Sequence, residues 1–131
     1  MMSKFETKQL PAQMDLHAPD GSEIRLLQAR DAGSFVHCTL PVGVVSKAIK
    51  HRTVEEIWYF LSGEGEVWRK MGDDEEVVKA VPGLSLTIPL GAHFQFRNTG
   101  NEPLTFVLVT MPPWPGEDEA IPVEDYWEVK G

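Results

Sequence analysis

Chemically active side chains are few in this sequence, and His51 and Glu56 form the most suggestive pair. They lie five residues apart, and Glu56 begins an apolar run that alternates in the manner of a strand. A carboxylate beside an imidazole can hold the ring in one tautomer, favour its protonated form and act with it as a general acid and base. The alternative is a buried pair that merely satisfies two polar groups.

His93 is the next candidate, and its role depends on the strand that carries it. Side chains alternate along a strand, so His93 faces outward if Phe94 faces inward. A one-residue bulge after Gly91 would reverse this and turn His93 inward. In that orientation His51, Glu56 and His93 could hold a metal ion through two imidazoles and one carboxylate.

His37 and Cys38 are neighbours in another apolar segment and are weaker candidates for a functional role. His37 could line a cavity, but a lone histidine on an apolar strand is more often a satisfied core or surface residue. Cys38 lies on the opposite face and is predicted to be a small buried hydrophobe. It is the single cysteine of the chain, so it can form neither an internal disulfide nor a multi-cysteine metal site.

Short apolar runs separated by glycine, proline and aspartate fill the sequence from residue 22 to residue 111. No stretch there holds a 3.6-residue period over three turns, which disfavours a helical core. Runs at this spacing predict an all-β sandwich or barrel of antiparallel strands. The predicted strands are 24–29, 34–40, 44–51, 56–61, 65–70, 75–81, 85–88, 93–97 and 104–111.

Two flanks surround this predicted domain of residues 22–111. Residues 1–21 are polar and are predicted to form an irregular N-terminal arm. Residues 112–131 form a C-terminal tail, whose proline-rich start at 112–116 cannot extend a sheet because proline lacks the ladder donor. The rest of the tail is acidic but also aromatic, so we expect it to lie over the strands.

Length and composition limit the classes of function. A chain of 131 residues suits one domain. Its net charge of −8 repels phosphate backbones and anionic lipid, so we expect neither nucleic-acid nor membrane partners. No run approaches the roughly 18 apolar residues of a membrane span. Residues 1–10 are too polar for a secretory signal, and we therefore expect a cytoplasmic protein.

Two segments, 43–63 and 83–98, resemble the two sequence blocks of the cupin superfamily. The family's first block reads G-x5-H-x-H-x4-E-x6-G, and its second reads G-x5-P-x-G-x2-H-x3-N. Here every glycine, the proline and the asparagine fall on this spacing, and the blocks lie 19 residues apart, as in compact members. The resemblance implies an all-β cupin double-stranded β-helix, a jelly-roll barrel, that forms homodimers by packing sheet against sheet.

The resemblance also implies a metal site, which this sequence keeps only in part. In metal-binding cupins two histidines and the glutamate of the first block, with the histidine of the second, hold one divalent ion. This chain keeps His51 and Glu56 but has Ile49 and Phe94 at the other two positions. Even catalytic zinc sites usually keep three protein ligands, so no conventional cofactor is expected. A divalent ion held by His51, Glu56 and a recruited His93 is the alternative.

The hydrocarbon side chains of Ile49 and Phe94 at two ligand positions predict an apolar barrel interior. Such an interior would have room for one small hydrophobic molecule. We therefore predict a cupin that binds a small molecule, with His51 and Glu56 as candidate catalytic residues for acid–base chemistry. Two alternatives stay open: a metal-dependent enzyme of the dioxygenase or isomerase type, and a non-catalytic structural domain with a filled core. The predicted pocket residues are Ile49, Trp58, Phe60, Phe94 and Asn98.

Overall fold

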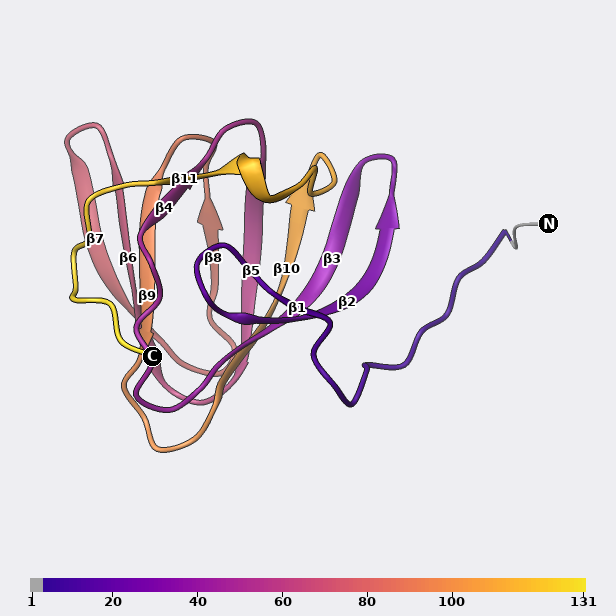
Figure 1. Cartoon of the computed structure of the whole chain (residues 1–131), viewed down its shortest axis with the longest axis horizontal. Helices are drawn as coiled ribbons and strands as arrows, with labels where there is room; N and C mark the ends of the chain where they lie inside the picture. The colour runs from indigo at the N-terminus through magenta and orange to yellow at the C-terminus, as the bar shows by residue number, and fades with distance from the viewer. Residues whose placement is uncertain (1–3) are drawn as a thin grey trace.

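The computed structural model describes residues 4–131, which form two antiparallel sheets that face each other (Figure 1). The larger sheet has six strands in the order β1-β2-β3-β10-β5-β8, and the smaller has five in the order β11-β4-β9-β6-β7. Within residues 4–131 the only helix is the short 3-10 helix η1, Glu117–Glu119, so the all-β prediction is confirmed. No helix in this range is long and apolar enough to span a bilayer. The first three residues of the predicted arm lie outside the described range.

The strands alternate with short turns along the chain, as the glycine and proline spacing predicted. Their bounds are β1 Leu16–His17, β2 Glu23–Arg30, β3 Gly33–Leu40, β4 Ile49–His51, β5 Glu55–Ser62, β6 Gly65–Met71, β7 Asp74–Ala80, β8 Ser85–Ile88, β9 His93–Asn98, β10 Leu104–Met111 and β11 Ala120–Pro122.

Three details of the predicted strand pattern are wrong. Of the stretch 44–51, only Ile49–His51 is a strand, and Val45 makes isolated bridges instead. The arm is not wholly irregular, because β1 pairs with β2, and the tail adds a strand, because β11 pairs with β4. Strands of two or three residues are too short to show a period of two in the sequence. Pro122 is tolerated because β11 lies at the edge of its sheet.

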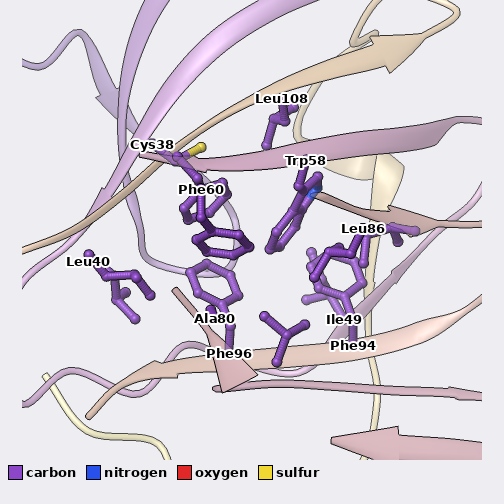
Figure 2. Close-up of a cluster of buried hydrophobic side chains, with 14 of the residues drawn as sticks. Cys38, Leu40, Ile49, Trp58, Phe60, Ala80, Leu86, Phe94, Phe96 and Leu108 are labelled. Atoms are coloured by element: carbon purple, nitrogen blue, oxygen red, sulfur yellow. The ribbon is translucent and has the colours of Figure 1, made fainter. Parts of the chain in front are cut away.

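The core lies between the two sheets, and alternation along the strands selects its members. On β5, Trp58 and Phe60 are buried while Ile57 and Tyr59 between them are exposed. Trp58 stacks on Phe106 of β10, with ring centroids 4.6 Å apart. Figure 2 shows Trp58 facing Phe94 and Phe96 of the smaller sheet, with ring centroids 5.5 and 5.2 Å away. Packing of this kind holds the strands that carry the polar residues in one register.

The C-terminal tail crosses the outer face of the smaller sheet (Figure 1, yellow), as its aromatic residues predicted. Tyr126 stacks on Trp68, with centroids 5.3 Å apart, and the Arg97 guanidinium lies 4.4 Å from the centre of the Trp127 ring. Gln95 faces this tail from β9 and is completely buried by it. Its side chain accepts hydrogen bonds from the Tyr126 and Trp127 amides and donates to the Trp127 carbonyl.

Candidate functional site

A cavity of about 310 Å³ lies between the sheets, at the side formed by β1, β2 and β3. Side chains from both sheets line it, and most of them are apolar. The main apolar contributors are Ile24, Leu26, Val36, Cys38, Ile49, Trp58, Phe94, Phe106, Leu108 and Trp114. The polar contributors include Asp20, Ser22, Ser34, His51, Glu56 and Thr110.

Glu56 is an acid of the cavity with a strongly shifted pKa. Its carboxyl accepts one hydrogen bond from the Trp58 indole at 3.0 Å and one from the Thr110 hydroxyl at 2.7 Å. Burial raises the pKa of Glu56 to about 7, helped by the charges of Asp20 and Glu119 and opposed by the two hydrogen bonds. The Thr110 hydroxyl oxygen can also accept a hydrogen bond from the protonated form of Glu56. Glu56 therefore changes charge near neutral pH while it stays hydrogen-bonded.

His51 lies between two aromatic rings at the same cavity. Its ring meets Phe94 and Trp114 edge to face, with centroids 5.2 and 5.5 Å away. The side chain is 4% exposed, and Nδ1 has no hydrogen-bond partner. Burial lowers the pKa of His51 to about 4, although the charge of Glu119 acts in the opposite direction. The imidazole is therefore neutral at physiological pH.

The predicted pairing of His51 with Glu56 is wrong in its detail. Both side chains line the cavity, but no hydrogen bond joins them within residues 4–131, since both Glu56 oxygens are engaged elsewhere and His51 Nδ1 has no partner. The expected protonated imidazole is wrong as well, because burial outweighs any nearby carboxylate. Burial thus shifts the pKa values of two groups in one cavity in opposite directions. His51 is a neutral base, and Glu56 is an acid that titrates near pH 7.

The carboxylate beside His51 is Glu119, which comes from the tail. Its oxygens accept hydrogen bonds from the Thr53 hydroxyl and amide, both at 2.6 Å, and from the Val54 amide at 3.0 Å. Burial opposes its ionisation, but these hydrogen bonds and the neighbouring imidazole lower the pKa of Glu119 below its usual value. Glu119 therefore fixes the turn between β4 and β5 and with it the position of His51.

The residues present do not fit the divalent ion that the resemblance implies. Ile49 on β4 and Phe94 on β9 are direct cross-strand partners, and both are buried. They fill two of the four ligand positions with hydrocarbon, which has no lone pair to offer. In residues 4–131 no three histidine, cysteine, aspartate or glutamate side chains gather where they could hold a metal ion.

The alternative three-residue metal site of His51, Glu56 and His93 does not form. The pairing of β9 with β6 runs without a register shift from Asn98 to His93, so no bulge turns His93 inward. Phe94 lines the cavity and His93 does not. His93 faces outward near Lys50 and Lys70, and partial burial together with these two charges lowers its pKa.

The structure brings only some of the predicted pocket residues to the cavity. Ile49, Trp58 and Phe94 line it, but Phe60 and Asn98 do not. Phe60 is packed in the core behind Trp58, with ring centroids 6.2 Å apart. The Asn98 side chain makes three hydrogen bonds to backbone groups. Its NH2 group donates to the Leu40 and Glu102 carbonyls, and its oxygen accepts from the Gly100 amide, so its role is to shape a turn.

On β3 the structure places Cys38 at the cavity and His37 away from it. Cys38 is 2% exposed and lines the cavity, in agreement with its prediction as a small buried hydrophobe. His37 does not line the cavity, because it points to the other face of the strand. Burial there lowers the pKa of His37, and the nearby charge of Arg25 adds to this shift.

Sequence reasoning missed four residues that complete the site: Asp20, Thr110, Trp114 and Glu119. Thr110 had a usable signal, because it continues the inward, apolar side of β10 and is the polar exception there. The other three lie in the arm and the tail, where no period links them to the strands. Their positions depend on contacts between segments far apart in the chain.

Comparison with known proteins agrees with this architecture. Residues 36–110, more than half of the chain, match the family described as "Cupin domain". An uncharacterized protein of Methanocaldococcus jannaschii is 34% identical over 88 residues, which are 67% of this chain and 67% of that protein.

Two solved structures extend the comparison from sequence to fold. A predicted oxalate decarboxylase of Thermotoga maritima superposes with a TM-score of 0.59 and 27% identity, over 70% of this chain and 80% of that one. Bacillus subtilis oxalate decarboxylase superposes with a TM-score of 0.70 and 14% identity, over 85% of this chain and 30% of that one. The predicted double-stranded β-helix is therefore confirmed.

Proposed function

Because the chain belongs to the cupin family, we propose that it binds a small, largely apolar organic molecule in the cavity between its sheets. The observation that carries this proposal is the cavity of about 310 Å³, which is at the lower end of the usual range for small-molecule sites. Its walls are mainly hydrocarbon and aromatic, with a few polar groups that could orient a ligand.

Glu56 is the group that we propose to exchange protons with the bound molecule. Its pKa of about 7 supports this role, since a general acid or base works best when its pKa is near the operating pH. His51 lines the same cavity as a neutral base with Nδ1 unpartnered. A molecule seated between the two could accept a proton from Glu56 and lose one to His51.

Oxalate decarboxylation, the activity named for two structural neighbours, fits this cavity poorly. Oxalate is a dianion at neutral pH and needs cationic partners or a metal ion. The titratable side chains that line this cavity are Asp20, Cys38, His51 and Glu56, and no lysine or arginine of residues 4–131 is among the lining residues. A dianion would therefore meet carboxyl groups without a compensating charge.

Benzene binding tests the proposal, because benzene is a small apolar molecule that apolar cavities can take up. We expect benzene at about 100 times its Kd to raise the free energy of unfolding of the full chain by about 2.7 kcal/mol. It should also slow the reaction of the Cys38 thiol with a disulfide reagent, because Cys38 lines the cavity.

Two matched variants locate the binding site. Val36→Trp adds a large side chain to the cavity wall and should abolish both effects. Val107→Trp makes the same change on the outward side of the adjacent strand β10 and should preserve them. If benzene neither stabilises the wild-type protein nor protects its thiol, the small-molecule proposal is wrong.

A further inference from the structure

Within residues 4–131, the cavity wall has acidic side chains but no lysine or arginine. Asp20 and Glu56 both line it, and both are more than nine-tenths buried. Asp20 Oδ1 accepts hydrogen bonds from the Ser22 amide at 2.9 Å and the Ser22 hydroxyl at 2.7 Å. The nearest balancing charge is Lys47, which acts on Asp20 but is exposed and does not line the cavity. Burial raises the pKa of both carboxyl groups, which shows that their charged forms lack full compensation in the cavity. A positively charged guest would supply that compensation, since no lining side chain of the described residues is a lysine or arginine.

The aromatic walls act in the same direction. Trp58, Phe94, Phe106 and Trp114 line the cavity. Aromatic faces carry the negative side of a quadrupole and attract ammonium groups within about 6 Å of the ring centre. Carboxyl groups among aromatic walls are the combination that recognises an organic cation better than a neutral molecule of the same shape.

His51 supplies an independent observation that points to a ligand. It is 4% exposed and lines the cavity, yet Nδ1 has no hydrogen-bond partner. A buried polar atom without a partner costs free energy, and native structures usually satisfy it with a ligand or water. A neutral imidazole nitrogen can accept a hydrogen bond from an ammonium group.

We propose that the cavity selects small organic cations: a protonated amine on a compact apolar or aromatic body. This inference rests on the proposed function and specifies its ligand class. The ammonium group lies against Glu56, with Asp20 and His51 as the other polar contacts, and the hydrocarbon body fills the space between the aromatic walls. Organic anions are disfavoured once these carboxyl groups are ionised, because the carboxylates repel them and no lining side chain in the described part of the chain compensates.

Binding of such a cation is coupled to the ionisation of Glu56. The groups that face this carboxyl are the Trp58 indole and the Thr110 hydroxyl, with the charges of Asp20 and Glu119 acting on it from the arm and the tail. An ammonium ligand favours the carboxylate, so binding below about pH 7 releases a proton from Glu56. The affinity for the cation should therefore increase as the pH rises through about 7.

Three probes of nearly equal size separate charge from shape: benzylamine as the cation, benzyl alcohol as the neutral molecule and benzoate as the anion. Titration calorimetry of the full chain at about pH 8, where Glu56 is mostly ionised, measures each affinity. We expect benzylamine to bind at least roughly tenfold more tightly than benzyl alcohol, and benzoate to bind more weakly than both.

Two substitutions on one strand provide the matched comparison. Glu56→Gln keeps the shape but removes the charge, with its amide oxygen accepting from the Trp58 indole and its NH2 group donating to the Thr110 hydroxyl. The preference for benzylamine over benzyl alcohol should therefore fall roughly tenfold. Glu55→Gln makes the same change at the exposed neighbouring position and should leave the preference intact.

Other results would contradict the cation preference, the role of Glu56 or the small-molecule proposal itself. If benzyl alcohol binds as tightly as benzylamine, or if benzoate binds most tightly, the cation inference is wrong and the small-molecule proposal survives. If Glu56→Gln leaves the preference unchanged, the assignment of Glu56 as the cation's partner is wrong. If none of the three probes binds to the wild-type protein, both the inference and the proposed function fail.

Discussion

At the scale of single residues, burial decides the charge states of this site. His51 and Glu56 line one cavity, and desolvation moves their pKa values in opposite directions, to about 4 and about 7. At neutral pH the base is therefore uncharged and the acid is partly protonated. A site of this kind can exchange a proton with a guest without first forming a buried ion pair.

The two pKa shifts should have opposite effects on stability. For Glu56 the folded pKa of about 7 exceeds its ordinary value of 4.5, so its stabilising contribution is present at low pH and is lost between about 4.5 and 7. For His51 the folded pKa of about 4 is below its ordinary value of 6.5, so stability is gained between about 4 and 6.5. In the wild-type protein the two slopes largely cancel between about 4.5 and 6.5.

Single variants should separate the two slopes in urea unfolding measured across pH. In His51→Gln the free energy of unfolding should fall by up to about 3 kcal/mol as the pH rises from about 4.5 to 7. In Glu56→Gln it should rise by a similar amount from about 4 to 6.5. Parallel pH profiles for the two variants would contradict the assigned shifts.

At the scale of elements, the pairing of β4 with β9 keeps the framework of the family's metal site although its ligands are missing. Ile49 and Phe94 are direct partners across these strands, and the backbone at both positions matches the family's spacing. The loss is therefore one of side chains, since the strands that would present the ligands are in place.

Restoring the two side chains should restore the ion. The double variant Ile49→His and Phe94→His should bind about one equivalent of Zn²⁺ with His51 and Glu56, measured by metal analysis after dialysis. Each single variant should bind more weakly, and adding His51→Ala to the double variant should remove the metal. A double variant that keeps the β-sheet circular dichroism spectrum but takes up no Zn²⁺ would show that the ligand geometry is absent.

One polar side chain, Gln95, makes a cluster of the hydrogen bonds that hold the tail to the smaller sheet. Gln95 makes four hydrogen bonds, to the Ser46 carbonyl and to backbone groups of Tyr126 and Trp127. Gln95→Leu should leave buried backbone groups unpaired and destabilise the protein by about 3 kcal/mol.

Hydrogen exchange localises this effect. The amides of Tyr126 and Trp127 should exchange much faster in Gln95→Leu than in the wild-type protein, because their acceptor is lost. Gln13→Leu, the same change in the exposed part of the arm, should alter neither stability nor exchange. Unchanged protection at Tyr126 in the first variant would show that the other tail contacts, such as the pairing of β11 with β4 and the stacking on Trp68, hold this segment without Gln95.

At the scale of the whole molecule, the two sheets differ in what covers their outer faces. The tail covers the smaller sheet. On the larger sheet, Ile57, Tyr59 and Leu61 form an apolar row on the outer side of β5, exposed by 46%, 47% and 42%. The resemblance to cupins implies a homodimer that packs sheet against sheet, and this row is where we expect the second copy, since contiguous exposed apolar side chains mark interaction surfaces.

Light scattering tests this expectation. The wild-type protein should have the mass of a dimer at micromolar concentration, and Ile57→Lys with Tyr59→Lys should convert it to a monomer, because a two-fold axis brings the added charges together. Val77→Lys, at an exposed apolar position of the smaller sheet, should keep the dimer. A monomeric wild-type protein would contradict the expectation.

The sequence alone determined the strands of the core and the absence of two metal ligands. Period-two alternation identifies the inward side of β5 and β9 from neighbouring residues, so Trp58 and Phe94 could be assigned to the interior and His93 to the outside unless a bulge intervened. The family's block spacing is enough to place Ile49 and Phe94 at two of the ligand positions.

Only the tertiary structure decided what surrounds His51. Its neighbouring carboxylate is Glu119 from the tail, its ring packs against Trp114, and the acid across the cavity is held by Thr110 of a strand distant in sequence. Local periodicity says which way a side chain points but not which distant segment it meets. Those meetings, and the burial that shifts the pKa values, depend on how the two sheets and the tail close around the cavity.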